Sequence, residues 1–266
     1  MARDDNPLGS FLRSRREKID AASAGVIDTT RRRVTGLRRE ELALLAGVSP
    51  SYYTRLEQGR DHNPSREILE ALAGALRLDD TERTYLWSLA TPPLAPAGTE
   101  PARTVRPGVL HLLERWSDLP AFVVDPRRDV LAATALAARV NPAWHPGHNL
   151  IEFTFLNARA PQVYPDWDDI TRQAVAGLRA TAATRHTELD PLITRMCARS
   201  ETFRTLWDSH DVYDRVTGEK RLRVNGIGIL RLSYETFALT GPEGHQLYVY
   251  FPQPGSKDDQ ALRDLA

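Results

Sequence analysis

Cysteine is almost absent from this sequence, because Cys197 is the only one among 266 residues. A single cysteine cannot form an intrachain disulfide, and it excludes a metal site built from cysteines alone. Such sparse cysteine usage is typical of proteins that work in the reducing cytoplasm. We therefore expect a cytoplasmic protein whose stability comes from its hydrophobic cores.

Long apolar runs and an excess of charge are also missing. No stretch of about 18 consecutive apolar residues is present, so the sequence predicts no transmembrane helix. The opening residues, MARDDNPLGS, lack the apolar core of a signal peptide. The 35 basic and 35 acidic residues cancel, so any attraction to nucleic acid has to come from a local cluster of charge.

Known catalytic motifs are absent as well: the sequence holds no Gly-x-Ser-x-Gly, phosphate-binding loop or dinucleotide fingerprint. His145 and His148 have the spacing of metal ligands, but the Pro and Gly between them favour an exposed loop. Cys197 with His186 or His210 as its base would be a nucleophile, yet its place on an apolar helical stripe favours the core. We expect no enzyme activity, no catalytic residue, no metal and no cofactor.

What the sequence does contain is a pair of helix patterns between Gly36 and Gly59, GLRREELALLAGVSPSYYTRLEQG. The first helix is expected to end at Gly47, because glycine readily takes the positive φ that ends a helix. Ser49 supplies an N-cap hydroxyl, and Pro50 suits the first position of a second helix. Two such helices joined by a short turn are typical of a DNA-binding helix-turn-helix, the alternative being an ordinary helical hairpin with a solvated face.

The exposed face of the second helix predicts the contacts with DNA. Arg is well shaped for bidentate bonding to guanine, and Ser can bond to any base. Residues 10–39 hold nine basic and three acidic side chains, a balance that favours phosphate contacts, although a run of arginines can also be merely solvated. The predicted DNA-binding residues are Arg32, Arg33, Arg39, Ser51, Tyr52, Arg55 and Gln58.

Apolar spacing predicts three further helices, at 8–19, after Pro64 and at 80–90, which makes an all-α domain of five helices over residues 1–90. Residues 8–90 resemble the five-helix domain of the XRE and lambda-repressor-like DNA-binding family. The segment RRRVTGLRREELALLAGVSPSYYTRLEQGR is similar to MmyB-like regulators. The resemblance implies DNA contacts at Arg39, Ser51, Tyr52 and Arg55.

A proline-rich linker, residues 91–107, separates this domain from a second one at 108–266. Short strands are expected at 121–124 and 130–132, followed by a helical middle with one helix around Leu178 and another around Met196. Three more strands are expected at 220–224, 228–238 and 246–251. This order predicts an α+β domain in which helices gather on one face of an antiparallel sheet of about five strands.

The second domain resembles the PAS-like ligand-binding domain of the same MmyB-like family, through segments such as LPAFVVDPRRDVLA, GILRLSYETFAL and YVYFPQPGS. The resemblance implies a small apolar ligand, with a fatty acid as the suggested class, bound between sheet and helices. Aromatic and apolar side chains are expected to line the pocket, although the same residue types also build ordinary cores. The predicted ligand-binding residues are Phe153, Phe155, Leu178, Phe203 and Trp207.

These features together predict a sequence-specific transcriptional regulator that binds a double-stranded DNA operator as a homodimer and senses a small molecule through its C-terminal domain. Two alternatives stay open. The C-terminal domain could serve only to dimerise a regulator that binds DNA constitutively. Alternatively, an enzyme could carry an attached DNA-binding module, in which case replacing Cys197 or the histidines would abolish a turnover.

Overall fold

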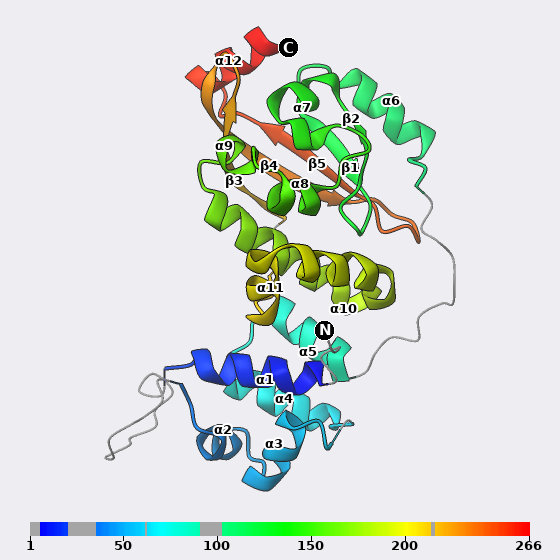
Figure 1. Ribbon diagram of the computed structural model, residues 1–266. Helices are drawn as coiled ribbons and strands as arrows, with labels where there is room; N and C mark the ends of the chain where they lie inside the picture. Colours follow the sequence, from blue (N-terminus) through cyan, green and yellow to red (C-terminus); the bar gives the residue numbers. More distant parts are fainter. Residues whose placement is uncertain (1–5, 21–35, 62, 91–102, 214–215) are drawn as a thin grey trace. The chain divides into compact units, whose positions relative to one another are not determined.

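The computed structural model describes residues 6–20, 36–61, 63–90, 103–213 and 216–266 (Figure 1). These residues divide into two units. The first consists of residues 1–94 together with Ser209–Tyr213, and the second consists of 95–208 and 214–266. Within the described ranges no helix is long and apolar enough to cross a membrane.

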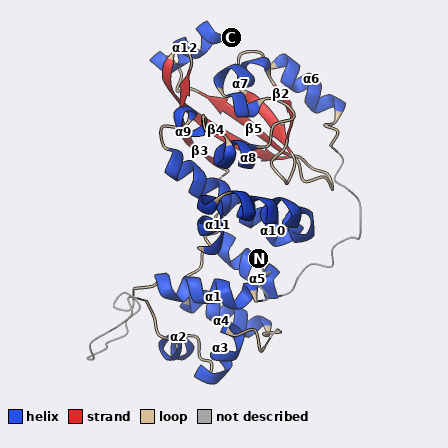
Figure 2. Cartoon of the chain, in the orientation of Figure 1, coloured by secondary structure: helices blue, strands red, loops and turns tan. Residues whose placement is uncertain are grey.

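Helices joined by loops, without a strand, make up the described residues of the first unit (Figure 2). Asn6 caps the first helix by accepting a hydrogen bond from the Gly9 amide at 3.0 Å, and the neighbouring proline occupies the first helical position. Every helix of this unit contributes side chains to its core, for example Phe11, Leu42 and Leu72. The helices of this unit are α1 (Pro7–Lys18), α2 (Arg39–Leu45), α3 (Pro50–Glu57), α4 (Arg66–Ala75) and α5 (Asp80–Ala90).

The helix-turn-helix prediction is confirmed in its local details. Gly47 takes a φ of 65° after α2, and Gly59 takes a φ of 64° after α3. Ser49 caps α3 by accepting a hydrogen bond from the Tyr52 amide at 3.2 Å, and Pro50 is the first residue of the helix. The end of α2 and both ends of α3 therefore have residues that suit their backbone conformation.

A close backbone approach fixes the entry to α2. A Cβ atom at Gly36 would lie 2.4 Å from the backbone oxygen of Glu17 at the end of α1, which only glycine avoids. The adjacent Leu37 amide donates to the Arg16 carbonyl at 3.1 Å, and the Arg16 guanidinium donates to the Leu37 carbonyl at 2.7 Å. The end of α1 and the start of the helix-turn-helix are thereby held together.

The second unit is an α+β domain around one five-stranded sheet, as predicted. Its strand order is β2-β1-β5-β4-β3, and every neighbouring pair is antiparallel. The strands are β1 (Ala121–Val124), β2 (Val130–Ala133), β3 (Thr217–Val224), β4 (Gly228–Ala238) and β5 (Gln246–Phe251). The helices are α6 (Pro107–Arg115), α7 (Ala135–Val140), the short 3-10 helix η1 (Pro142–Trp144), α8 (Leu150–Leu156), α9 (Ala160–Val163), α10 (Trp167–Arg199), α11 (Glu201–Asp208) and α12 (Lys257–Leu265).

Both faces of the central strands are covered. On one face Phe122 and Tyr250 belong to a large cluster that includes residues of α7, α8 and α9, and on the other face Val123 and Val249 pack with Leu113 of α6. Helix α6 therefore departs from the expected placement of all helices on one face. This two-sided cover explains why all four residues of β1 are buried.

The helical middle of the second unit contains the two expected helices as the two halves of α10. A kink at Arg185, where φ is −133° and ψ is 37°, separates them. Pro191 lies in the part after the kink. The two halves correspond to the two helix patterns that the sequence indicated around Leu178 and Met196.

Candidate nucleic-acid interface and small-molecule cavity

Helix α3 separates its side chains into an inner and an outer face. Tyr53 and Leu56 are fully buried in the core of the first unit, whereas Ser51, Arg55 and Gln58 are exposed. The structure thus brings together on one surface three of the residues predicted to contact DNA. This surface carries hydroxyl, guanidinium and amide groups, which are the hydrogen-bonding groups that read base edges.

Arg55 is positioned by an aromatic ring and by one acidic side chain, and it remains accessible. Its guanidinium carbon lies 5.4 Å from the ring centre of Tyr52, and its Nη2 atom lies 3.8 Å from Oδ2 of Asp61. The side chain remains 48% exposed. The Tyr52 ring is half-buried, so it supports the arginine from one side and leaves its donors accessible.

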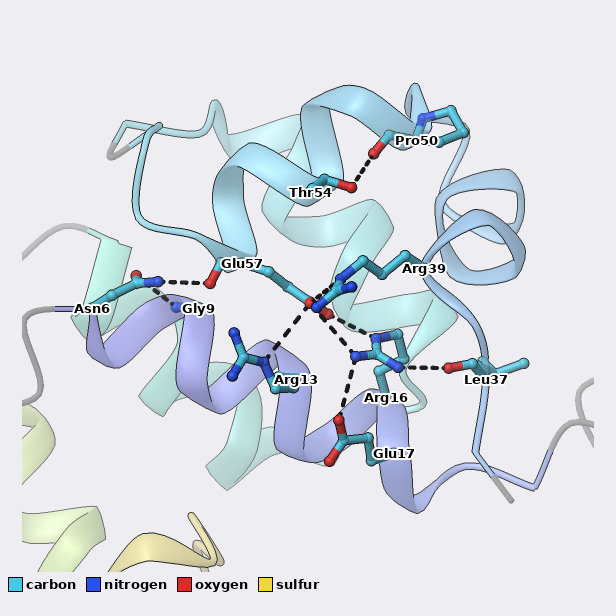
Figure 3. A network of polar contacts seen from close by, with 10 residues as sticks. All are labelled: Asn6, Gly9, Arg13, Arg16, Glu17, Leu37, Arg39, Pro50, Thr54 and Glu57. Carbon is cyan, nitrogen blue, oxygen red and sulfur yellow. Dashed lines mark hydrogen bonds and ion pairs between the residues drawn. The ribbon is translucent and has the colours of Figure 1, made fainter. Parts of the chain in front are cut away.

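A buried carboxylate on α3 is surrounded by arginines of the neighbouring helices (Figure 3). The Glu57 side chain is fully buried and accepts hydrogen bonds from Arg16 Nε at 2.7 Å and Arg39 Nε at 2.6 Å. Burial raises the pKa of the Glu57 carboxyl, but the hydrogen bonds from Arg16 and Arg39 outweigh it and hold the pKa below its ordinary value. One ionised group therefore links α1, α2 and α3.

Arg39, one of the predicted DNA-binding residues, also belongs to this network. Its Nε atom is bound to Glu57, yet the side chain is 45% exposed, so it is anchored at the start of α2 and still accessible. The sequence analysis did not identify Glu57. Its position at i+4 from the buried Tyr53 was the available sign that it faces inward. The predicted Arg32 and Arg33 lie outside the described residues.

In the second unit, four of the five predicted ligand-binding residues lie in one hydrophobic cluster between α8, α10 and α11. Leu178 and Phe203 are fully buried, and the Phe203 ring contacts those of Phe155 and Trp207 at 5.2 and 5.9 Å between ring centres. Arg179 lies over the Trp207 ring, 4.0 Å from its centre. These residues are packed against one another.

Phe153, the fifth predicted residue, belongs to the large cluster of Phe122 and Tyr250 on the sheet. It lines a cavity of about 490 Å³, together with Leu156, which packs against the first cluster. The cavity therefore lies between the cluster of Phe122 and Tyr250 and the cluster of α8, α10 and α11. Its volume is in the range of pockets that hold small molecules. Its lining residues are Pro142, Gly147, His148, Asn149, Glu152, Phe153, Leu156, Asn157, Arg159 and Arg199.

The wall of this cavity carries more positive than negative side chains. Glu152 is paired with Arg195, which donates to it at 2.6 Å. Arg159 and Arg199 are exposed, and no carboxylate within salt-bridge distance is found for them among the described residues. The cavity thus combines an apolar wall with two positively charged side chains.

Comparison with protein families matches both units. The model of the MmyB-like transcription regulator ligand binding domain matches residues 105–265, and that of a helix-turn-helix domain matches residues 7–86. The chain belongs to the MmyB-like transcription regulators. The matches confirm the predicted family and the combination of a helix-turn-helix domain with a ligand-binding domain. A search among curated proteins found no match.

The MmyB-like ligand-binding domain has a second group of cations that sequence reasoning missed. Lys220 lies on β3 over the rings of Tyr234 and Tyr250, 5.1 and 5.9 Å from their centres. Burial, together with the positive charge of Arg128, lowers the pKa of Lys220 to about 8. Arg128 itself donates to Thr181 Oγ1 at 2.9 Å. The strand alternation that turns Lys220 inward, in step with Leu222, was the sign available in the sequence.

Three of the groups considered for chemistry are His145, His148 and Cys197. The rings of His145 and His148 are 5.5 Å apart, and among the described residues no group of three His, Cys, Asp or Glu side chains could hold a metal ion. Cys197 is buried in the α10–α11 cluster. Burial, with the nearby Asp208 charge, raises the pKa of the Cys197 thiol, which disfavours the thiolate that a nucleophile needs.

Proposed function

We propose that this MmyB-like chain is a sequence-specific transcriptional regulator whose C-terminal domain changes its DNA binding when it takes up a small, largely apolar molecule. The observation that carries the DNA-binding part is the exposed face of α3. Arg55 and Gln58 lie there beside Ser51, on a helix capped at its start and anchored from below by Glu57. In a helix-turn-helix this face enters the major groove.

The proposed contacts divide into two kinds. Arg55, supported by Tyr52, donates to a guanine edge, and Ser51 and Gln58 read neighbouring bases. Arg39, anchored on Glu57 at the start of α2, binds a phosphate. We assign the same role to Arg32 and Arg33 from the sequence, and such contacts set the register of the protein on the duplex.

As the ligand site we propose the cavity lined by Phe153, between the cluster on the sheet and the cluster of α8, α10 and α11. Phe153 and Leu156 provide its apolar wall, and Arg159 and Arg199 attract an anionic group. A long-chain carboxylate such as a fatty acid has this composition. Its chain would extend toward Phe155, Leu178, Phe203 and Trp207, the remaining predicted residues, by separating side chains that pack together in the structure.

We further propose that the regulator acts as a homodimer, because paired recognition helices about 34 Å apart match a pseudo-palindromic operator. The ligand then acts only through its different affinity for DNA-competent and DNA-incompetent arrangements. The alternative, a C-terminal domain that merely dimerises, predicts that no ligand changes DNA binding.

The DNA-binding proposal is tested by replacing Arg55. Arg55→Ala should weaken binding to duplexes selected from a random pool by about 1–3 kcal/mol and relax the preference at one base position. The matched control is Arg66→Ala on α4, which also removes one arginine stacked on an aromatic ring, 5.2 Å from the centre of Trp87. Equal affinities for Arg55→Ala and wild type in a fluorescence anisotropy titration would show that α3 does not read the groove.

The ligand proposal is tested with two probes that differ only in their head group, dodecanoate and dodecanol. Exchanging both Arg159 and Arg199 for Gln should lower the affinity for dodecanoate about tenfold, because a charge-assisted hydrogen bond is lost, and leave that for dodecanol unchanged. Calorimetric titration of the full chain measures both. Arg172→Gln, at the opposite end of α10 from Arg199, is the control for a lost surface charge. An equal loss for both probes, or none, would contradict this site.

A further inference from the structure

The segment Ser209–Tyr213 belongs to the first unit, although it follows α11 of the ligand-binding domain directly in the chain. It lies far in sequence from the rest of that unit, which ends at Leu94. Val212 is buried, so the segment is packed rather than merely adjacent. The first unit therefore includes a peptide that lies between α11 and β3 of the second unit in sequence.

Five polar contacts bind this segment to one face of α1. Ser14 Oγ donates to the Ser209 carbonyl at 2.8 Å, and Lys18 Nζ donates to the same oxygen at 3.1 Å and to Asp211 Oδ1 at 2.5 Å. Arg15 Nη2 donates to the His210 carbonyl at 2.5 Å and to Asp211 Oδ1 at 3.4 Å. The donors are consecutive or one turn apart on α1, so they form a single surface.

The backbone of the segment turns at His210, and a hydrogen bond within the segment holds the Asp211 carboxylate. His210 has a φ of 54°, the left-handed conformation, and Ser209 Oγ donates to Asp211 Oδ2 at 3.0 Å. Burial raises the pKa of the Asp211 carboxyl, but the hydrogen bonds and charge of Lys18, with Ser209 and Arg15, outweigh it and hold the pKa low. Asp211 is thus the ionised partner of two cations on α1.

The same part of α1 is connected to the DNA-reading helices. Arg15 also pairs with Glu82 of α5 at 2.6 Å, and its neighbour Arg16 binds Glu57 of α3, which in turn holds Arg39. No residue separates α11, which ends at Asp208, from the segment. A movement of the end of α11 must therefore shift the segment on α1 or detach it.

We propose that Ser209–Tyr213 is the connection through which the ligand-binding domain regulates DNA binding, by holding or releasing α1. This inference rests on the proposed function for its regulatory part, whereas the docking of the segment stands on its own contacts. The partner surface of α1 consists of Ser14, Arg15 and Lys18, and its occupant is this acidic turn of the same chain.

The docking is tested by hydrogen exchange of the full-length chain without DNA. Asp211→Ala should raise the exchange rates of the α1 amides about threefold to tenfold, the range for losing a partly exposed ion pair with further hydrogen bonds. Asp208→Ala, which removes the preceding exposed acid, is the control. Lys18→Met should also raise these rates, and the double variant should show less than the sum of the two increases, because the two residues share one ion pair. Unchanged α1 exchange in Asp211→Ala would overturn the docking.

The regulatory part is tested with a selected DNA duplex, because coupling between sites is reciprocal. In the wild type, duplex binding should alter exchange at α2 and α3 and also at α11. In Asp211→Ala the change at α2 and α3 should remain, and the change at α11 should be lost. A persistent response of α11 in that variant would overturn the connection. A wild type in which no duplex protects α2 and α3 would instead refute the proposed function, while the exchange of α1 without DNA still decides the docking.

Discussion

Glu57 joins three helices of the first unit through one buried carboxylate. Its carboxylate receives Arg16 from α1 and Arg39 from α2, and it is itself part of α3. A buried ionised group of this kind is stable only while its partners remain, because removing one leaves an uncompensated charge. This contact, together with the buried Tyr53 and Leu56, fixes the orientation of α3 and so of Arg55.

We therefore predict that Glu57→Gln lowers the free energy of unfolding of the first unit by about 3 kcal/mol at pH 7. Because the folded-state pKa of Glu57 is lowered, its contribution is present above the ordinary glutamate pKa and is lost as the pH falls through the folded value. The wild type should lose stability on acidification more steeply than the variant. Exchange of the α1 and α3 amides across a urea series, at several pH values, measures both effects.

Glu70→Gln provides the control for that experiment. Glu70 pairs with Arg83 at 3.1 Å, but its side chain is 48% exposed, so the pair is screened by solvent. We expect a change within about 0.5 kcal/mol for this variant. If Glu57→Gln unfolded like Glu70→Gln, the network beneath α3 would not be what positions it.

Among the helices, those with local end signals could be read from the sequence. Ser49, Pro50 and the glycines at 47 and 59 specify the ends of α3 by conformational preferences that need no tertiary contact. The partition of α3 into buried and exposed faces followed from spacing alone. The exposed part of the candidate site was therefore accessible to prediction before the structure was known.

The remaining features depend on contacts between distant segments. No local pattern indicates that residues 209–213 join the first unit, or that α6 covers the opposite face of the sheet from α7. Phe203 and Phe153 have similar sequence surroundings, yet one is packed in a cluster and the other lines a cavity. Core and pocket are built from the same residue types, so only the structure distinguishes them.

The assembly of the full-length chain determines how much sequence one operator must contain. One chain presents one helix α3, and the short stretch of bases that a single recognition helix reads would give little discrimination across a genome. We predict that native mass spectrometry of the full-length chain shows a dimer. Duplexes selected from a random pool should then contain two inverted half-sites whose centres are about 10 base pairs, or a multiple, apart.

The same measurement separates the ligand-sensing regulator from its constitutive alternative. If the dimer loses a lipid-sized mass on denaturing extraction, the cavity beside Phe153 is occupied by a natural ligand, which can be identified and added back to the DNA titration. A ligand-free dimer whose DNA affinity is indifferent to dodecanoate would favour a C-terminal domain that only dimerises. A monomer that selects single half-sites would contradict the dimer, because paired recognition requires both copies of α3 to be engaged.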